Sequence, residues 1–209
     1  MRDLGVVLDS ELSLAAHVSH ITSVCYFQIR QIRLLRRYVS FEAVHALMCA
    51  LVHSRLDYCN AVPANAPQSL LVPLQSVLRS AAHVVPRCPH TAGLTRLIHE
   101  RLHWLPVPER ITFKLATLAY KCIRGWALDY QASTCTGDDS VEALACLHSA
   151  TAGKLLLPTT DTVMVGQRGF YYACPATWNS LPPHLTDMSM SLFSFRKLLN
   201  TLCCFIDIT

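Results

Sequence analysis

Apolar residues at every third or fourth position mark the segment from about Leu14 to Val39. This spacing places them along one face of an α-helix, so the pattern predicts a helix over these residues. Arginines at positions 30, 33 and 37 fall on the opposite face. A second helix is predicted over residues 40–56, because Ser40 is a favourable N-cap residue and Glu42 in the first turn complements the helix dipole.

Further along the chain, helical periodicity returns in several segments. Proline is tolerated in the first turn of a helix, and glycine is favoured just after the last turn. The last helix is expected to have Ser189 or Ser191 as its cap. The predicted helices are 70–85 with Pro73 in its first turn, a short one over Thr95–Leu102, one from Pro108 to a C-terminal cap at Gly125, and one over Leu192–Ile206.

Little of the chain shows the alternation or the residue types of β-strands. Leu4–Asp9 is a short β-prone run whose partner is expected upstream, because a lone strand is not stable. A small hairpin is expected near residues 155–165, and Phe170–Asn179 is ambiguous. The predicted fold class is therefore mainly α: a helical bundle with a C-terminal helical extension and minor β structure. The predicted divisions are residues 1–13, a helical domain over 14–128, a linker over 129–154 and a C-terminal extension over 155–209.

Composition narrows the class of protein. The chain has 209 residues, of which 52% are hydrophobic and only 15% charged, so it is far from intrinsic disorder. It has no apolar stretch of the roughly 20 residues that a bilayer requires, and no secretory signal is recognised at Met1. We therefore expect an intracellular protein of the cytoplasm or nucleus, with no membrane partner. Its ten cysteines are irregularly spaced, which favours reduced thiols packed in the core over a disulfide framework.

The basic cluster Arg30, Arg33, Arg36 and Arg37 is the main candidate for binding chemistry. Three of these residues share a helix face about one turn apart, a spacing that suits successive phosphates of a nucleic-acid backbone. A solvated helix face explains the same pattern equally well. The net charge of +4 permits a nucleic-acid partner without demanding one.

The sequence motifs that could indicate catalysis or metal binding are weak. Gly137-Asp138-Asp139 has the form of a polymerase turn that holds two Mg²⁺ ions, but polar residues flank it where hydrophobic strands would be needed. It is better explained as a turn followed by a helix cap. Local pairs such as His99 and His103 lack a second pair in zinc-finger register, so no metal, cofactor or catalytic residue is predicted.

Several blocks, taken together and in order, match a known family. The two most specific are Ser54–Asn60 (Ser-Arg-Leu-Asp-Tyr-Cys-Asn) and Leu102–Val107 (Leu-His-Trp-Leu-Pro-Val) followed by Arg110-Ile111. Weaker matches are Leu4–Asp9 with Leu12, Ser13 and His17, then Leu74–Val77, Gly166–Arg168, Ala176–Pro182 and Ser194–Arg196. Together they span nearly the whole chain and resemble the C-terminal (thumb and post-thumb) part of a LINE-type (non-LTR) retrotransposon reverse transcriptase.

The resemblance implies a truncated fragment of an RNA-directed DNA polymerase. Residues 1–13 correspond to the end of the palm, and the helices of 14–128 to the thumb, which grips the template–primer duplex. It thereby favours weak binding of RNA or an RNA/DNA duplex by the arginine cluster. The family's catalytic aspartates precede the point where this chain begins, so Asp138-Asp139 cannot take their role and the chain is not expected to be an enzyme.

Two stretches depart from the family pattern. Gly125–Tyr130 has Leu128 where the family tends to have proline, and Pro158–Asp161 lacks the two arginines usual there. Drift of this kind is expected in a decayed genomic copy. Two alternatives therefore stand beside nucleic-acid binding: a structural or protein-interaction helical module that self-associates through exposed apolar faces, and a translated remnant without a function.

Overall fold

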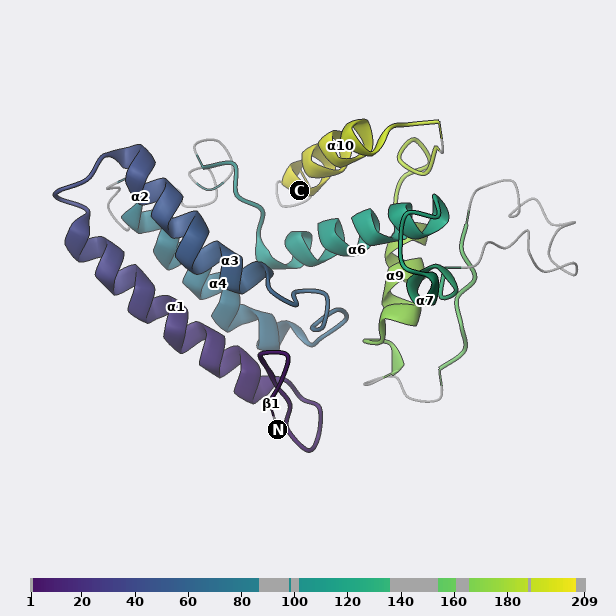
Figure 1. Ribbon diagram of the computed structural model, residues 1–209, viewed down its shortest axis with the longest axis horizontal. Helices are drawn as coiled ribbons and strands as arrows, with labels where there is room; N and C mark the ends of the chain where they lie inside the picture. Colours follow the sequence, from purple (N-terminus) through teal and green to yellow (C-terminus); the bar gives the residue numbers. More distant parts are fainter. Residues whose placement is uncertain are drawn as a thin grey trace, which may run out of the picture. The chain divides into compact units, whose positions relative to one another are not determined.

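The computed structural model describes residues 2–86, 98, 102–135, 154–160, 166–187 and 189–205 (Figure 1). The described chain is mainly helical, which confirms the fold class predicted from the sequence. It divides into two compact units. The first comprises Met1–Asn60 and Ala66–Arg110, and the second comprises Ala61–Asn65 and Ile111–Thr209.

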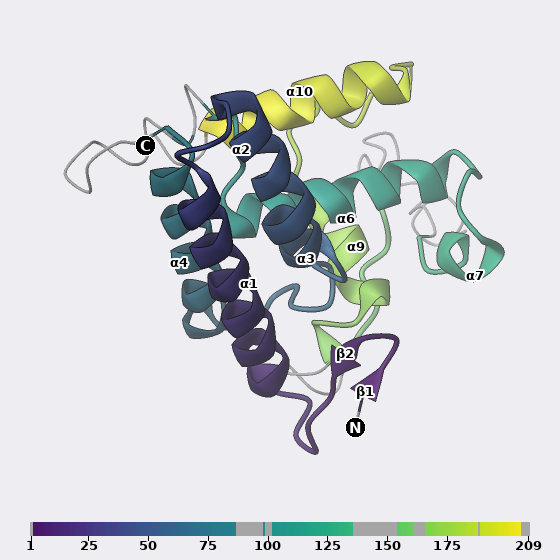
Figure 2. The same ribbon diagram turned by 60° about the vertical axis from the view of Figure 1, so that its left-hand side comes forward.

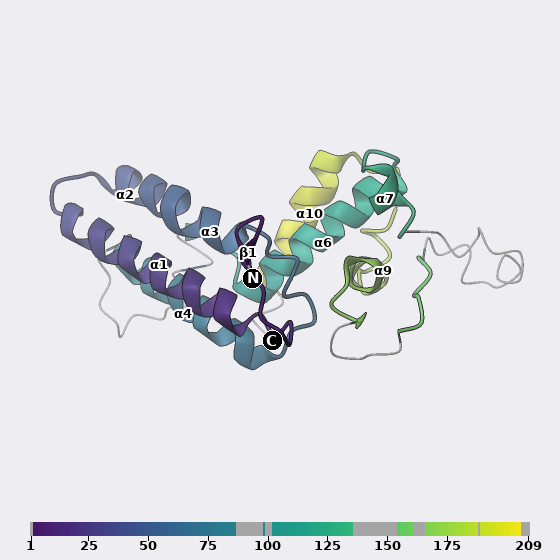
Figure 3. The same ribbon diagram turned by 60° about the horizontal axis from the view of Figure 1, so that its bottom comes forward.

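The first unit is built on long helices that lie side by side. They are α1 (Ala15–Leu35), the consecutive segments α2 (Phe41–Met48), η1 (Cys49–His53) and α3 (Ser54–Asp57), and α4 (Gln68–Val84). In Figures 1, 2 and 3, α1 runs along α4, and α2 and α3 continue one another beside this pair. The apolar faces predicted from the periodicity form the core. Its buried members include Cys25, Ile29, Ile32, Val44, Met48, Val52, Val77, Leu78, Ala81 and Ala82.

Local sequence explains where the second helical stretch begins and how it is interrupted. Ser40 adopts extended dihedral angles, and its hydroxyl oxygen accepts a hydrogen bond from the Ala43 amide at 3.3 Å, which confirms the predicted cap. The helix predicted over 40–56 is not regular throughout, because η1 is a π-helical turn. A π turn changes which side chains face the core beyond it. Immediately after the turn, the Ser54 hydroxyl donates to the Ala50 carbonyl.

A β-hairpin at the N-terminus corrects one expectation. Strand β1 (Arg2–Asp3) pairs antiparallel with β2 (Val6–Val7), in the register Arg2 with Val7 and Asp3 with Val6. The strand partner is therefore not upstream, and Leu4–Asp9 is not one strand. Leu4 and Gly5 form the turn with φ angles of 43° and 84°. Positive φ at both central residues is typical of a type I′ turn, and a bulky leucine there does not signal a turn in the sequence.

The second unit is organised by the packing of helices around aromatic side chains. It contains α6 (Val107–Ile123) from Ile111 onward, α7 (Asp129–Ala132), α9 (Phe170–Asn179) and α10 (Leu192–Phe205). The ring of Tyr120 stacks on Phe195 with centroids 4.7 Å apart, and Trp178 lies 5.9 Å from the same phenylalanine. The Tyr120 hydroxyl donates to the Met190 carbonyl, which fixes the chain just before α10.

Several sequence predictions are settled in this unit. The ambiguous segment Phe170–Asn179 is a helix, α9, even though it contains Pro175. Gly125 follows α6 with a φ of +66°, as expected of a C-terminal cap. Ser191, and not Ser189, accepts a hydrogen bond from the Ser194 amide at the start of α10.

Among the described cysteines, five lie in the interior, as expected from the sequence, and Cys49, Cys59 and Cys204 are half-buried. Cys25, Cys122, Cys135, Cys174 and Cys203 are buried as free thiols. The sulfur atoms of Cys135 and Cys174 lie 3.6 Å apart within the second unit.

Some predicted features lie outside the described residues. They are the turn over Gly137–Asp139, residues 161–165 of the expected hairpin, and most of the helix predicted over Thr95–Leu102. Within the described residues, no helix combines the length and the apolarity needed to cross a membrane.

Candidate nucleic-acid interface

The C-terminal half of α1 presents arginines to solvent. Arg30, Arg33 and Arg37 are all exposed. The first two lie on α1, and Arg37 follows Arg36, which keeps helical dihedral angles after the helix ends. At 100° per residue, the three positions fall within a sector of about 60° of the helix surface. We call Arg30, Arg33 and Arg37 the arginine face.

No negative charge accompanies the arginine face in the local sequence. Between Glu11 and Glu42 the chain has no acidic residue. Among the described residues, none of the three arginines forms an ion pair with a carboxylate. Their guanidinium groups therefore provide positive charge that is not compensated locally, which is the electrostatic condition for attracting a polyanion.

Exposed aromatic and aliphatic side chains border the arginine face. Phe27 and Leu34 lie on the adjacent sector of α1, and Tyr38 follows beyond its end with 72% of its surface exposed. The Arg37 guanidinium lies over the Tyr38 ring, 4.7 Å from its centroid. Phe41 is also exposed, at the start of α2. A positive surface with accessible rings is the combination that single-stranded nucleic acids meet in their binding proteins.

Arg36 has a different environment from the other three arginines of the predicted cluster. It is half-buried, and its Nη2 donates to the Val85 carbonyl at 3.0 Å. Val85 is the C-terminal cap residue of α4. This contact joins the end of α1 to the end of α4, so the structure gives Arg36 a role in packing and does not place it with the arginine face.

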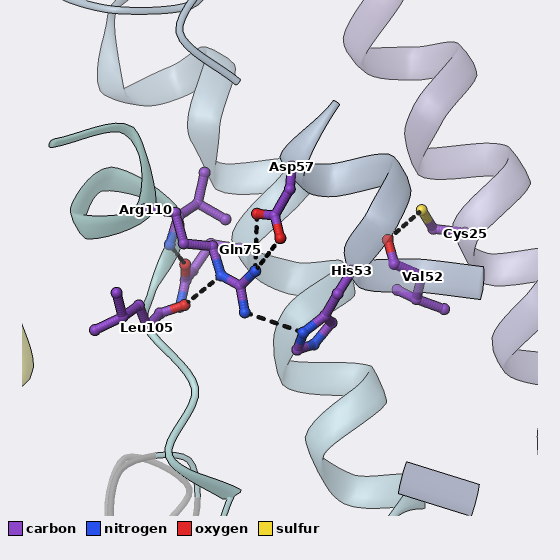
Figure 4. Close-up of polar contacts among 8 residues, drawn as sticks. Cys25, Val52, His53, Asp57, Gln75, Leu105 and Arg110 are labelled. Atoms are coloured by element: carbon purple, nitrogen blue, oxygen red, sulfur yellow. Dashed lines mark hydrogen bonds and ion pairs between the residues drawn. The ribbon is translucent and has the colours of Figure 1, made fainter. Parts of the chain in front are cut away.

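A polar network centred on Arg110 gives no signal in the sequence (Figure 4). Its Nε donates to the Leu105 carbonyl at 2.7 Å, and its Nη1 lies 2.8 and 3.0 Å from the two carboxylate oxygens of Asp57. Its Nη2 lies 3.1 Å from the Nδ1 of His53. Beside it, the Val107 amide donates to the side-chain oxygen of Gln75 at 2.9 Å. We call His53, Asp57, Leu105 and Arg110 the Arg110 network.

Burial controls the protonation of His53. The side chain is only 7% exposed, and burial, reinforced by the positive charges of Arg110 and His45, lowers the pKa of His53 from 6.5 to about 3. The ring is therefore neutral at pH 7, and its Nδ1 accepts from Arg110. The Trp104 ring packs against it edge-on, with centroids 4.1 Å apart. Trp104 in turn donates from its indole nitrogen to Nε2 of His45 at 3.2 Å.

The Arg110 network connects segments that are distant in sequence. Asp57 belongs to the block Ser54–Asn60, whereas Leu105 belongs to Leu102–Val107. No local pattern predicts that these blocks meet, because about fifty residues separate them in the chain. The network fixes the chain entering α6 against the end of α3, and it consists of groups that are already engaged with one another. It is a packing device and offers no reactive group.

No protein-family model matches the chain, and neither the curated proteins nor the solved structures contain a significant match. Within the part of the chain that the structure describes, no three His, Cys, Asp or Glu side chains gather as a metal site would require.

Proposed function

We propose that this chain is the thumb and post-thumb part of a LINE-type reverse transcriptase and that its arginine face binds the backbone of RNA or of an RNA/DNA duplex. One observation carries the binding proposal: three exposed arginines lie about one helical turn apart along α1 and just beyond its end, in a stretch without acidic residues. Each guanidinium can meet one phosphate and release its counterions. The ordered sequence blocks support the family origin.

In this proposal the chain binds nucleic acid without performing polymerase chemistry. The family's catalytic aspartates have no counterpart in the matching blocks of this sequence. Purified chain supplied with Mg²⁺, deoxynucleotides and a primed RNA template should therefore not extend the primer. Extension above a heat-treated control would contradict this part of the proposal.

The binding test compares two triple variants that change the net charge equally. The first replaces Arg30, Arg33 and Arg37 with Gln. The second replaces Arg79, Lys114 and Lys197, which are exposed on other helices, with Gln. Both lower the formal net charge of +4 by three. Fluorescence anisotropy with a labelled single-stranded RNA and a labelled RNA/DNA hybrid measures the affinity at several salt concentrations.

The arginine-face variant should bind about ten- to a hundredfold more weakly at low salt. The slope of log affinity against log salt should fall by about 2 to 3, since each lost phosphate contact removes about 0.7 to 0.9. The control variant should keep most of the affinity and of the slope. Equal losses in both variants, or no loss in either, would remove the arginine face from the proposal.

A second candidate function rests on the apolar stripe beside the arginines. Phe27 and Leu34 on α1 and Tyr38 just beyond its end are all more than half exposed, which is unusual for neighbouring large side chains of this kind. In this alternative, α1 associates with a second copy of the chain. Raising the salt concentration weakens binding to phosphates but preserves or strengthens apolar association. Sedimentation velocity at low and high salt therefore separates the two functions.

A further inference from the structure

A pocket of about 350 Å³ lies on the first unit, away from the arginine face. It is bordered by the first half of α1, by the turns of η1 and α3, and by the hairpin turn. Its volume falls at the lower end of the range of small-molecule sites. Its lining residues are Gly5, His17, His20, Ile21, Val24, Ala50, Leu51, Ser54, Arg55 and Tyr58.

The lining combines a positive charge, without any negative charge, with an apolar wall. Arg55 is exposed, and no carboxylate stands among the lining residues. Ile21, Val24 and Leu51 provide aliphatic surface. Sites for small molecules typically place a few polar groups in such a mainly apolar lining, where the polar groups fix the orientation of the ligand.

His17 adds a neutral donor to this lining. Its Nδ1 accepts a hydrogen bond from the Val7 amide at 3.3 Å, so in the neutral ring the hydrogen resides on Nε2. Burial, with a contribution from His20, lowers the pKa of His17 and favours this neutral form at pH 7. The lining thus includes the neutral ring of His17 together with the cationic side chain of Arg55.

The pocket is held in shape from the hairpin side. The Tyr58 hydroxyl donates to the Leu4 carbonyl, which ties the hairpin turn to the end of α3. Gly5 lies directly against this ring, because a β-carbon at Gly5 would be 3.4 Å from the Tyr58 Cε1. The hairpin turn therefore forms part of the pocket wall, together with α1 and α3.

We propose that this pocket binds a small organic anion, with a carboxylate or phosphate group near Arg55 and an apolar body against Ile21, Val24 and Leu51. The charge of Arg55 and the absence of acidic lining residues select the anion. The aliphatic wall selects the apolar body. The site is independent of the arginine face, because His17 and Arg30 are 13 residues apart on α1, which is about 20 Å along a helix.

The test uses 2-naphthoate, 2-naphthyl phosphate and the uncharged 2-naphthalenemethanol as probes of the full chain. Amide chemical shifts in nitrogen-15 NMR spectra map the binding and give the dissociation constants. We expect the Gly5 amide to shift with both anions and expect the uncharged compound to bind at least tenfold more weakly. The tighter of the two anions identifies the preferred head group, and either result supports the proposal.

Two substitutions separate pocket binding from general attraction of anions. Arg55→Gln should weaken the binding of the anions about tenfold and leave 2-naphthalenemethanol unchanged. Arg79→Gln is the matched control, because it removes the same charge from an exposed position of the same unit outside the pocket, and it should leave the affinity for all three probes unchanged. Equal weakening by both substitutions, no shift at Gly5 with 10 mM anion, or equal affinity for the uncharged compound would overturn the proposal. Arg55→Gln should retain RNA binding. A failure of the pocket proposal can therefore be distinguished from a failure of the arginine face.

Discussion

Lowering the pH from 7 to 5 should destabilise the first unit through His53. Burial, together with the charges of Arg110 and His45, lowers the pKa of His53 from 6.5 to about 3 in the folded protein. The unfolded chain keeps the ordinary value, so between these two pH values only the unfolded chain takes up the proton. The free energy of unfolding must therefore fall as the pH decreases through this window.

The size of the effect follows from the width of the window. Well below pH 6.5, each pH unit removes about 1.4 kcal/mol from the free energy of unfolding. Between pH 7 and pH 5 the loss amounts to about 2 kcal/mol, because the first half-unit lies above the unfolded pKa. The side chain is 7% exposed, so solvent screening reduces this figure little. The pKa of His17 is also lowered, which adds a contribution of the same sign.

A single substitution isolates the contribution of His53. His53→Asn keeps an acceptor that can receive the Arg110 hydrogen bond and removes the titration. Urea unfolding monitored by circular dichroism between pH 7 and 4.5 gives the free energy at each pH. The wild type should lose about 2 kcal/mol more than His53→Asn between pH 7 and 5. His20→Asn, at an exposed position, should follow the wild type.

Nuclear magnetic resonance offers the direct refutation. The Hε1 resonance of His53 in the folded protein should not titrate above pH 4. A midpoint near 6.5, or parallel pH dependences of wild type and His53→Asn, would show that the ring is not held neutral by burial and by Arg110.

Two further predictions concern the same unit. Asp57→Ala should lower the free energy of unfolding by only about 1 kcal/mol, because the carboxylate is half exposed. Arg110→Ala should lower it by about 2 to 3 kcal/mol, because this substitution also releases the Leu105 carbonyl and the buried His53. Urea unfolding at pH 7 measures both, and equal costs would contradict the network. At the hairpin, Leu4→Asn should stabilise the unit by about 0.5 kcal/mol and Gly5→Ala should destabilise it by about 1 kcal/mol, since both positions have positive φ. Thermal unfolding checks the pair, and the same sign for both substitutions would argue against the type I′ turn.

The helices could be predicted from the sequence because their signals are local. Apolar spacing and a capping serine are sufficient to place the start of α1 and the start of α2, whereas α1 ends at Leu35 and not near Val39. Local signals gave a wrong prediction at the N-terminal hairpin. There Leu4 adopts a conformation that costs energy for a leucine, so composition pointed to a strand where the chain turns.

The candidate site could be predicted only in part, for a similar reason. The arginine face follows from helical spacing, since Arg30, Arg33 and Arg37 needed only the period of α1. The environment of Arg36 depends on Val85, 49 residues away, and no pattern in the sequence reports such a contact. The Arg110 network and the pocket at Arg55 likewise combine segments whose proximity is decided by tertiary packing.

The contacts also bear on how the sequence blocks should be interpreted. Three of them, Ser54–Asn60, Leu74–Val77 and Leu102–Val107, meet around Arg110 through Asp57, Gln75 and Leu105. These three blocks therefore share one packing site, and no member of the arginine face takes part in it. The family proposal and the binding proposal therefore stand on separate residues, and either can fail while the other holds.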